Sequence, residues 1–162
     1  MGRVPGPRAL DASTASTLAG VRANEQDDQR GVSAFAVSIG VSVESRGVDG
    51  EDLGWVNGRF DSSRATLEGA RAVSVGVQAL VLATLMELAT SEALSPGARV
   101  GAATALSTTP EGIVFAGPVY LVRAEVVGLS ARVAHCEASL SDEDGRVHAR
   151  AAGTYFVVRS SD

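Results

Sequence analysis

The feature that most limits the fold of this chain is one long apolar segment, residues 73–93, with the sequence VSVGVQALVLATLMELATSEA. The segment holds too many Ala, Leu and Met residues for a strand, and it is too apolar for a surface helix. A helix that is hydrophobic on nearly every side must be enclosed by other elements. Because Gln78, Thr84 and Glu87 interrupt it, and because a membrane span needs about 20 apolar residues, we expect a buried helix rather than a membrane helix.

Residues on the N-terminal side of this helix show the alternation of a half-buried strand. From Ser33 onward every second residue of the run is apolar, and the set comprises Phe35, Val37, Ile39, Val41 and Val43. Alternation with this period predicts a strand with one buried face. A turn signal at residues 47–50 leads to a second extended stretch that reaches Phe60, so we expect an antiparallel hairpin.

After the helix, the sequence returns to strand patterns. The cluster Ser95-Pro96-Gly97 is typical of a helix stop. Beyond it, we expect strands at residues 100–108, 113–127, 131–140 and 146–159, with only turns between them.

The last two strands are joined by residues 141–145, a loop of acidic turn formers and glycine that favours a hairpin. A register with Leu140 opposite Val147 brings the apolar faces of both strands together. The same register places Glu137 opposite Arg150 as a cross-strand ion pair.

Length and composition bound the number of domains. With 162 residues, 45% of them hydrophobic, the chain is long enough for one core and short for two ordinary domains. Residues 1–30 are rich in Pro, Gly, Ala, Ser and charge, so we expect a flexible N-terminal arm there, with a short helical segment at 10–21. Residues 31–162 are expected to form the folded domain.

Charge and cysteine content exclude several classes of function. Charged residues make up 20% of the chain and the net charge is −5, so we expect no basic face for nucleic acid. No apolar segment follows the N-terminal arginines as a secretory signal requires, which predicts a cytoplasmic protein without a membrane anchor.

Cys136 is the only cysteine, which excludes an intramolecular disulfide and a thiolate metal cluster. We expect it to be packed within a strand, and no metal-ligand spacing stands out.

An extended hairpin, one buried helix and further consecutive strands predict an α+β fold in which a curved antiparallel sheet wraps around one apolar helix. Residues 33–160 resemble the hotdog superfamily in the helix quoted above and in the strings VYLVRAEVVG and SDEDGRVHARAAGTYFVV. The last string is similar to the ending of thioesterases of the phenylacetate-degradation and 4-hydroxybenzoyl-coenzyme A type. The resemblance implies hydrolysis of an acyl-coenzyme A thioester by a homodimer or a dimer of dimers. Coenzyme A is then part of the substrate, and no metal or redox cofactor is required.

The resemblance also implies site residues. In this family a carboxylate on the central helix acts as general base or nucleophile, and a backbone N–H at the helix N-terminus polarises the thioester carbonyl. The family string is H-G-G, followed two helical turns later by Asp or Glu. One alignment makes Glu87 the carboxylate, with Gln78 in place of the histidine and Leu80 in place of the second glycine. A second alignment places residues 74–76 on H-G-G and brings Ala83 to the carboxylate position. We prefer the first, because a lone Glu in an apolar helix is costly to bury without a function.

Two of these assignments have a structural alternative. Thr84, Glu87 and Ser91 fall on one helical face, so they either line a substrate site or form a polar stripe toward solvent or an interface. Gln78 is either an amide that positions the substrate or a residue near the helix N-terminus that is hydrogen-bonded to the backbone.

Two further groups have residue types that suit substrate contacts. Ser107 and Thr108, together with Thr109, come where related enzymes place a hydroxyl that holds the attacking water; ordinary strand-end hydroxyls are the alternative. The spaced arginines before the helix suit either the phosphates of coenzyme A or a solvated rim, and they are Arg59, Arg64 and Arg71.

The histidines weigh against one rival activity. His135 and His148 are the only two, and the expected hairpin register places both on polar faces, with His148 opposite Ser139. We therefore expect both to be solvated and dispensable, which disfavours a hotdog hydratase or dehydratase that uses a catalytic histidine. A non-catalytic hotdog module that binds an acyl group or a partner is the other rival, because the H-G-G string is absent.

Overall fold

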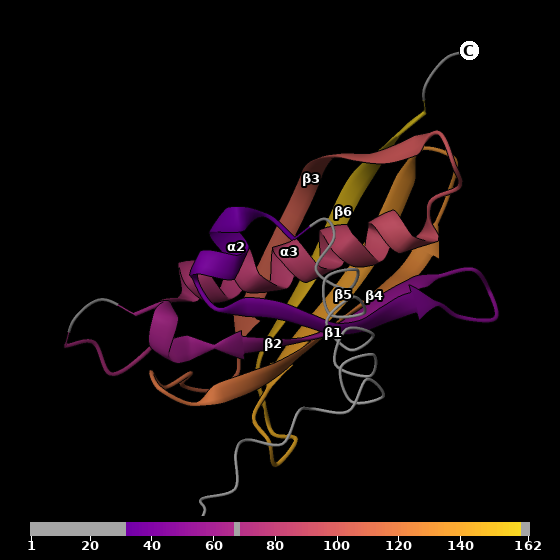
Figure 1. Cartoon of the computed structure of the whole chain (residues 1–162). Coiled ribbons are helices and arrows are strands. Elements are labelled where there is room, and N and C mark those ends of the chain that lie inside the picture. The colour runs from indigo at the N-terminus through magenta and orange to yellow at the C-terminus, as the bar shows by residue number, and fades with distance from the viewer. Residues whose placement is uncertain (1–31, 67–68, 160–162) are drawn as a thin grey trace, which may run out of the picture. The chain divides into compact units, whose positions relative to one another are not determined.

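The computed structural model describes residues 32–66 and 69–159. The arm expected at residues 1–30, its helical segment at 10–21 and the boundary at residue 31 lie outside the described residues. The described chain forms one antiparallel sheet with strand order β1-β2-β4-β5-β6-β3 and a central helix (Figure 1). Its elements are α2 (Ala34–Ser38), β1 (Val41–Val48), β2 (Gly54–Asp61), the 3-10 helix η1 (Ser62–Arg64), α3 (Val75–Ala93), β3 (Ala98–Pro110), β4 (Val119–Leu129), β5 (Val133–Ser141) and β6 (Val147–Arg159).

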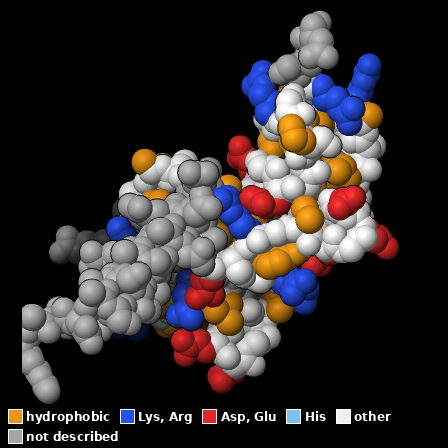
Figure 2. Space-filling view, turned by 45° about the vertical axis from the view of Figure 1, so that its right-hand side comes forward, with side chains coloured by type: hydrophobic (Ala, Val, Ile, Leu, Met, Phe, Trp, Pro, Cys, Tyr) orange, Lys and Arg blue, Asp and Glu red, His pale blue; other side chains and the backbone are white. Residues whose placement is uncertain are grey.

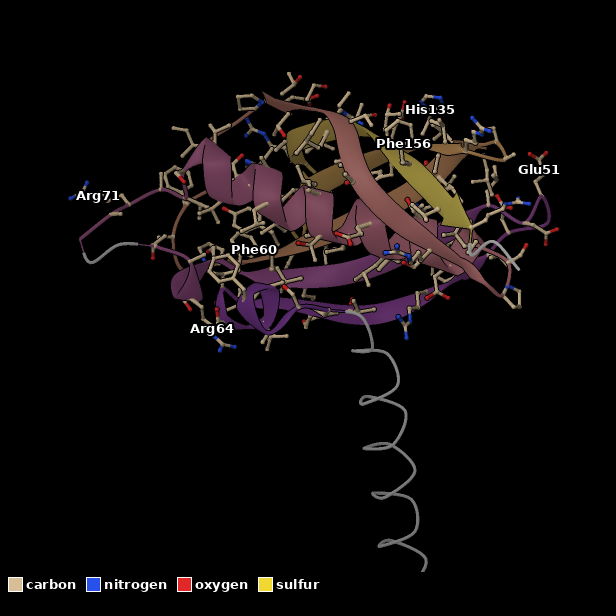
Figure 3. The ribbon with its side chains drawn as sticks, turned by 90° about the horizontal axis from the view of Figure 1, so that it is seen from above. Glu51, Phe60, Arg64, Arg71, His135 and Phe156 are labelled. Carbon is tan, nitrogen blue, oxygen red and sulfur yellow. The ribbon has the colours of Figure 1, made fainter. Side chains whose placement is uncertain are left out.

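Helix α3 is the enclosed helix that the sequence predicts. Ser74 caps its start, where the side chain accepts a hydrogen bond from Val77 N–H at 3.3 Å, so the helix begins at Val75. It lies within the curve of the sheet and contacts all six strands (Figure 3). By length and composition α3 could cross a membrane. Its apolar residues, however, form the core of the sheet, so it is a core helix, as expected.

Close packing fixes where α3 crosses the sheet. A Cβ added to Gly54 on β2 would lie 1.9 Å from the carbonyl oxygen of Ala89, so the helix rests directly on the strand backbone there. The buried side chains of α3 that fill the curve are Gln78, Val81, Leu82, Leu85, Met86, Leu88, Ala89 and Thr90. The contact at Gly54 sets the distance between helix and sheet at this crossing.

The strand expected from Ser33 is wrong in its first part. Ser33 caps the short helix α2 by accepting from Ala36 N–H at 3.1 Å, and β1 begins only at Val41. Ala36 is buried, whereas Phe35 is 61% exposed, so the alternating apolar residues of this part do not share a buried face. An alternation of so few residues also fits one turn of helix, and the N-cap serine decides the outcome.

The residues before β4 also depart from the expected strand. Residues 113–118 form a loop, and β4 begins at Val119. Gly117 has a φ of 112°, and Pro118 has no N–H to donate to a sheet, so this pair ends the extended pattern. Within the loop, Phe115 forms an isolated bridge with Ala72, just before α3.

The hairpin β5–β6 forms as expected, but its register is shifted by two residues. Leu140 pairs with Ala149, and Ser141 pairs with Val147, so His148 is an extra residue in a β-bulge. Glu137 consequently lies opposite Ala152 rather than Arg150. The predicted Glu137–Arg150 pair is therefore wrong, and Arg150 instead pairs with Glu111 at 2.8 Å.

Candidate active site

The first turn of α3 leaves backbone donors available. The N–H of Val77 is capped by Ser74 Oγ, and the N–H of Gln78 donates to Ser74 O at 3.1 Å. The N–H groups of Val75 and Gly76 precede these and have no acceptor within the helix. Both residues are exposed, and the helix dipole adds partial positive charge at this end. This end of α3 can therefore polarise a carbonyl oxygen.

Gln78 lies at the same end of α3 but faces inward. Its side chain is 3% exposed, and Nε2 donates to Val73 O at 3.0 Å. Its Oε1 has no hydrogen-bond partner within residues 32–66 and 69–159. Leu80 lies in the second turn, where its N–H belongs to the hydrogen-bond ladder of the helix. The free donors thus fall on the residues of the second alignment rather than on Leu80.

Glu87 belongs to an incompletely covered face of α3 that we name the open stripe. It comprises Gly76, Ala79, Leu80, Ala83, Thr84 and Glu87, all of them half-buried or exposed. Their spacing of three or four residues places them on one side of the helix. Thr84 Oγ1 donates to Leu80 O at 2.9 Å, so its hydroxyl is held against the helix. Glu87 is exposed near the C-terminal end of the stripe.

Tyr155 of β6 is hydrogen-bonded to the backbone of α3 at the middle of the open stripe. Its hydroxyl donates to the carbonyl oxygen of Ala83 at 3.1 Å, and the residue is 3% exposed. Burial raises the pKa of Tyr155, and the nearby Cys136 and Glu87 raise it further. The phenol therefore stays protonated and keeps donating to the helix beside Glu87.

One chain does not bring the free donors and the carboxylate together. Gly76 and Glu87 lie on the same face, but eleven residues of helix at a rise of about 1.5 Å per residue place them about 16 Å apart along the axis. A reacting carbonyl has to lie within about 3–3.5 Å of the attacking atom. The open stripe of a single chain therefore holds both components of a hydrolytic site at opposite ends.

The hydroxyls expected after the helix lie within β3 and point to different faces. Thr108 pairs with the buried Ala151, so it faces the α3 side, and its Oγ1 is buried without a partner among the described residues. Ser107 pairs with the exposed Ala152 and faces outward. There it lines a shallow hollow of about 280 Å³ together with Arg123 and other outward side chains. Only Thr108 of these two therefore faces the helix.

A loop that sequence reasoning missed borders the start of α3. Val114 O accepts from Val73 N at 2.8 Å, and Ser62 Oγ accepts from Gly117 N at 2.9 Å. These bonds hold residues 111–118, which we call the bordering loop, against the segment before the helix. Its outward side chains Ile113 and Phe115 are 59% and 53% exposed. The exposed, apolar Ile and Phe after Pro110 are the only signal in the sequence for this surface.

The two histidines have different environments. His135 is exposed, as expected, and its Nδ1 lies 3.1 Å from Thr154 Oγ1. The prediction that His148 is solvated is wrong: the residue is 8% exposed, because the bulge turns it inward. Its Nε2 lies 2.8 Å from Asp142 Oδ2, and its ring meets the ring of Tyr120 edge-on at 5.5 Å.

Arginines mark the same end of the molecule as the helix start. Arg71 is exposed and lies on the segment that leads into α3, and Arg64 is exposed in η1 on the same side of the view in Figure 3. Arg59 instead pairs with Glu44 on the neighbouring strand. On the face seen in Figure 2, acidic and basic side chains of the described residues are interspersed. Arg64 and Arg71 are therefore the two candidates for contacts with a phosphate at this end.

Cys136 is a packing residue on β5, as expected. It is 1% exposed, and burial raises the pKa of its thiol, although the nearby Thr90 hydroxyl opposes the shift. Among the residues that the structure describes, no group of three or more His, Cys, Asp and Glu side chains is arranged to hold a metal ion.

Comparisons with known proteins rest on structure alone. No family model and no curated protein matches the sequence. A thioesterase from Haemophilus influenzae superposes with a TM-score of 0.70 at 18% identity, over 83% of this chain and 90% of that chain. A phenylacetic acid degradation-related protein from Ralstonia eutropha gives 0.65 at 22% identity, over 77% and 90%. Thioesterase superfamily member 2 from zebra fish gives 0.65 at 18% identity, over 86% and 96%. Together with the curved antiparallel sheet around one central helix, these similarities show that the chain has the hotdog fold.

Proposed function

We propose that the protein hydrolyses an acyl-coenzyme A thioester in the cytoplasm, as a homodimer or a dimer of dimers. The observation that carries this proposal is the open stripe of α3, which begins at the free N–H groups of Val75 and Gly76 and carries the exposed carboxylate of Glu87. The similar hotdog structures that are named thioesterases support the choice of reaction. Coenzyme A enters as part of the substrate, and the chemistry needs no metal or redox cofactor.

In this proposal a second copy of the chain brings a carboxylate to the free donors, which a single chain does not do. A two-fold axis beside the point between Val81 and Leu82 would set two α3 helices antiparallel, with Gly76 of each copy opposite Glu87 of the other. The small residues Ala79 and Ala83 would let the helices approach closely. Strand β3 is an edge strand and is exposed over much of its length, so it also favours coverage by a second copy.

In this dimer, the carbonyl oxygen of the thioester accepts hydrogen bonds from Val75 and Gly76, which stabilise the charge that develops there. Glu87 of the other copy takes a proton from water as the water oxygen attacks the carbonyl carbon, or its carboxylate attacks directly and forms a mixed anhydride that water then hydrolyses. The carbon–sulfur bond then breaks, and the thiolate of coenzyme A leaves and is protonated. Thr84 lies beside Glu87 on the stripe, and Thr108 offers a hydroxyl on the same side of the sheet.

The surroundings of the helix start suit the two halves of the substrate. Val75, Ile113 and Phe115 expose apolar surface next to the free N–H groups, which favours an apolar acyl group. Arg64 and Arg71 lie at the same end and suit the phosphates of coenzyme A. Gln78 acts by holding Val73, so its role is to position the helix start rather than to contact the substrate.

The first test removes the carboxylate. Glu87→Gln should lower the turnover of acyl-coenzyme A esters by a factor on the order of 10² or more, the effect expected for loss of a general base. Release of free thiol from a panel of acyl chain lengths measures this. Glu51→Gln is the matched control, because Glu51 is an exposed carboxylate in the β1–β2 turn and lies outside the open stripe (Figure 3). Equal turnover of Glu87→Gln and wild type would contradict the assignment.

A non-catalytic acyl-binding module is the second candidate. The observation that favours it is the inward orientation of Gln78, which leaves no side chain of this residue for a substrate. Binding of acyl-coenzyme A without release of thiol would support this alternative.

A further inference from the structure

We propose that His148 is a positioning residue: it links the acidic β5–β6 hairpin to the bordering loop and thereby fixes the segment from which α3 starts. The part of this inference that concerns turnover rests on the proposed function. The part that concerns the segment before α3 does not, and it can be measured on the protein without substrate.

The first link joins His148 to the hairpin. Asp142 closes the hairpin loop, where its Oδ1 accepts from Arg146 N–H at 2.9 Å. Its Oδ2 lies 2.8 Å from His148 Nε2, so one carboxylate bonds both the loop backbone and the buried ring. A hydrogen bond with an ionised acceptor is stronger than a neutral one. The bulged residue is therefore tied to the hairpin by its side chain.

The second link joins His148 to the bordering loop. The carbonyl oxygen of His148 accepts from Glu111 N at 2.8 Å and from Gly112 N at 3.0 Å. A Cβ added to Gly112 would lie 3.0 Å from His148 Nδ1, so the loop backbone passes directly over the ring. Tyr120, which packs edge-on against this ring, accepts from Phe115 N at 2.8 Å through its hydroxyl. His148 and its ring partner thus hold the loop at two places.

The third link joins the bordering loop to α3. Val114 O accepts from Val73 N at 2.8 Å, and Ala116 N donates to Arg71 O at 3.0 Å. Val73 O in turn accepts from Gln78 Nε2 within the helix. A continuous series of hydrogen bonds and packed groups therefore runs from Asp142 to the first turn of α3. Val73 is adjacent to Ser74, the N-cap that precedes the free donors.

The contacts also indicate which nitrogen of the neutral His148 ring carries the proton. Asp142 offers an acceptor to Nε2, whereas Nδ1 is buried without a partner among the described residues. The arrangement requires the proton of a neutral ring on Nε2, with a bare lone pair on Nδ1 facing Gly112. A ring that only filled space would not need one tautomer. A neutral ring with its proton on Nε2 is therefore the result expected if His148 is hydrogen-bonded to Asp142.

The experiment compares three single variants by amide hydrogen exchange of Val73, Phe115 and Ala116. His148→Phe keeps a ring against Tyr120 but removes the N–H. His148→Gln keeps an N–H that can reach Asp142. His135→Phe is the matched control, because His135 is the exposed histidine of the neighbouring strand.

We expect His148→Phe to speed the exchange of these amides by about tenfold, the scale expected for loss of one hydrogen bond to a charged group. His148→Gln should restore most of the protection, and His135→Phe should leave it unchanged. In wild type at a pH where the ring is neutral, the ring ¹⁵N shifts of His148 should show the proton on Nε2 and none on Nδ1. Should His148→Phe not fold, Tyr120→Phe and Asp142→Asn test the same path, and each should speed exchange at Phe115.

Turnover adds an independent readout. With an active wild type, His148→Phe should lower kcat more than it raises KM, because the donors act on the transition state. If wild type hydrolyses no thioester but His148→Phe still loosens these amides, the proposed function fails and the positioning role stands. Unchanged exchange in His148→Phe, or a neutral ring whose proton is on Nδ1, would overturn the inference.

Discussion

At the scale of one residue, the hydrogen bonds of Asp142 in the β5–β6 hairpin affect both its pKa and the stability of the fold. The hydrogen bond from His148 lowers the pKa of this carboxyl, and the backbone N–H of Arg146 lowers it further. A carboxyl whose pKa is lower in the folded than in the unfolded chain stabilises the fold above its unfolded pKa of about 3.9. This contribution is lost as the pH falls through the lowered folded pKa.

The consequence is a stability difference that depends on pH. Asp142→Asn should unfold at lower urea concentration than wild type at pH 7, because the charge that assists the His148 contact is gone. The difference should shrink as the pH falls below about 4, where the wild-type carboxyl is increasingly protonated. Urea midpoints measured from pH 7 to about 2 test this, with Asp144→Asn in the same loop as control. A difference that stays constant over this whole range would contradict the assigned role.

Single residues are also where prediction from sequence is weakest. The alternation around His148 places it on a polar face, because one inserted residue in a bulge leaves no trace in the pattern of apolar residues. The donors at Val75 and Gly76 depend in the same way on the position of one cap, Ser74. The sequence offers Glu87 as a candidate through the cost of burying a carboxylate, but the structure leaves Glu87 exposed, and α3 carries a second carboxylate at Glu92.

Elements are predicted better than residues because they average over many side chains. An apolar segment rich in Ala, Leu and Met predicts helix α3, and the strand patterns after it predict β3 to β6; the structure confirms these elements with shifted ends. The errors fall on two short segments. In residues 33–39 the N-cap serine favours a helix although the apolar residues alternate. In residues 113–118, Gly117 and Pro118 interrupt the extended pattern. The contact of α3 with β2 depends on Gly54, whose need for a bare backbone is not visible in the sequence.

Replacement of Gly54 tests that contact. Gly54→Ala would place a methyl group 1.9 Å from the carbonyl oxygen of Ala89, and the helix backbone has to move away. We expect a loss of about 1–3 kcal/mol in the free energy of unfolding, as for other overpacked sites. Gly50→Ala is the control: no atom lies within 4 Å of its added Cβ, and the change should stay within about 0.5 kcal/mol. Equal stability of the two variants would show that α3 does not rest on β2 there.

At the scale of the whole molecule, the hotdog fold positions the two surfaces on which the proposed two-copy site depends. Among residues 32–66 and 69–159, the sheet encloses one side of α3, and no other described element covers the open stripe or the free edge of β3. Because the free donors and Glu87 lie at opposite ends of that stripe, the proposed site requires two copies. Sequence reasoning reached the fold through resemblance, and the structure confirms it. The oligomer and the role of Glu87 stay predictions. The sequence does not reveal that the free donors and Glu87 lie at opposite ends of the stripe, because helix ends and exposure follow from packing.

Mixed dimers of two defective chains test this account most directly. Val75→Pro removes one donor N–H at the first helical position, where proline is tolerated, and the extended Ser74 before it (ψ 151°) accommodates the ring. Val75→Ala, which keeps the N–H, is its control. Glu87→Gln and Val75→Pro chains carry different tags, are co-expressed, and are purified as mixed dimers whose mass is checked by light scattering. Each mixed dimer retains one unaltered site of two, so thiol release should recover to about half of the wild-type rate, while each variant alone stays low. Mixed dimers no more active than the separate variants would contradict a thioesterase site completed by a second copy.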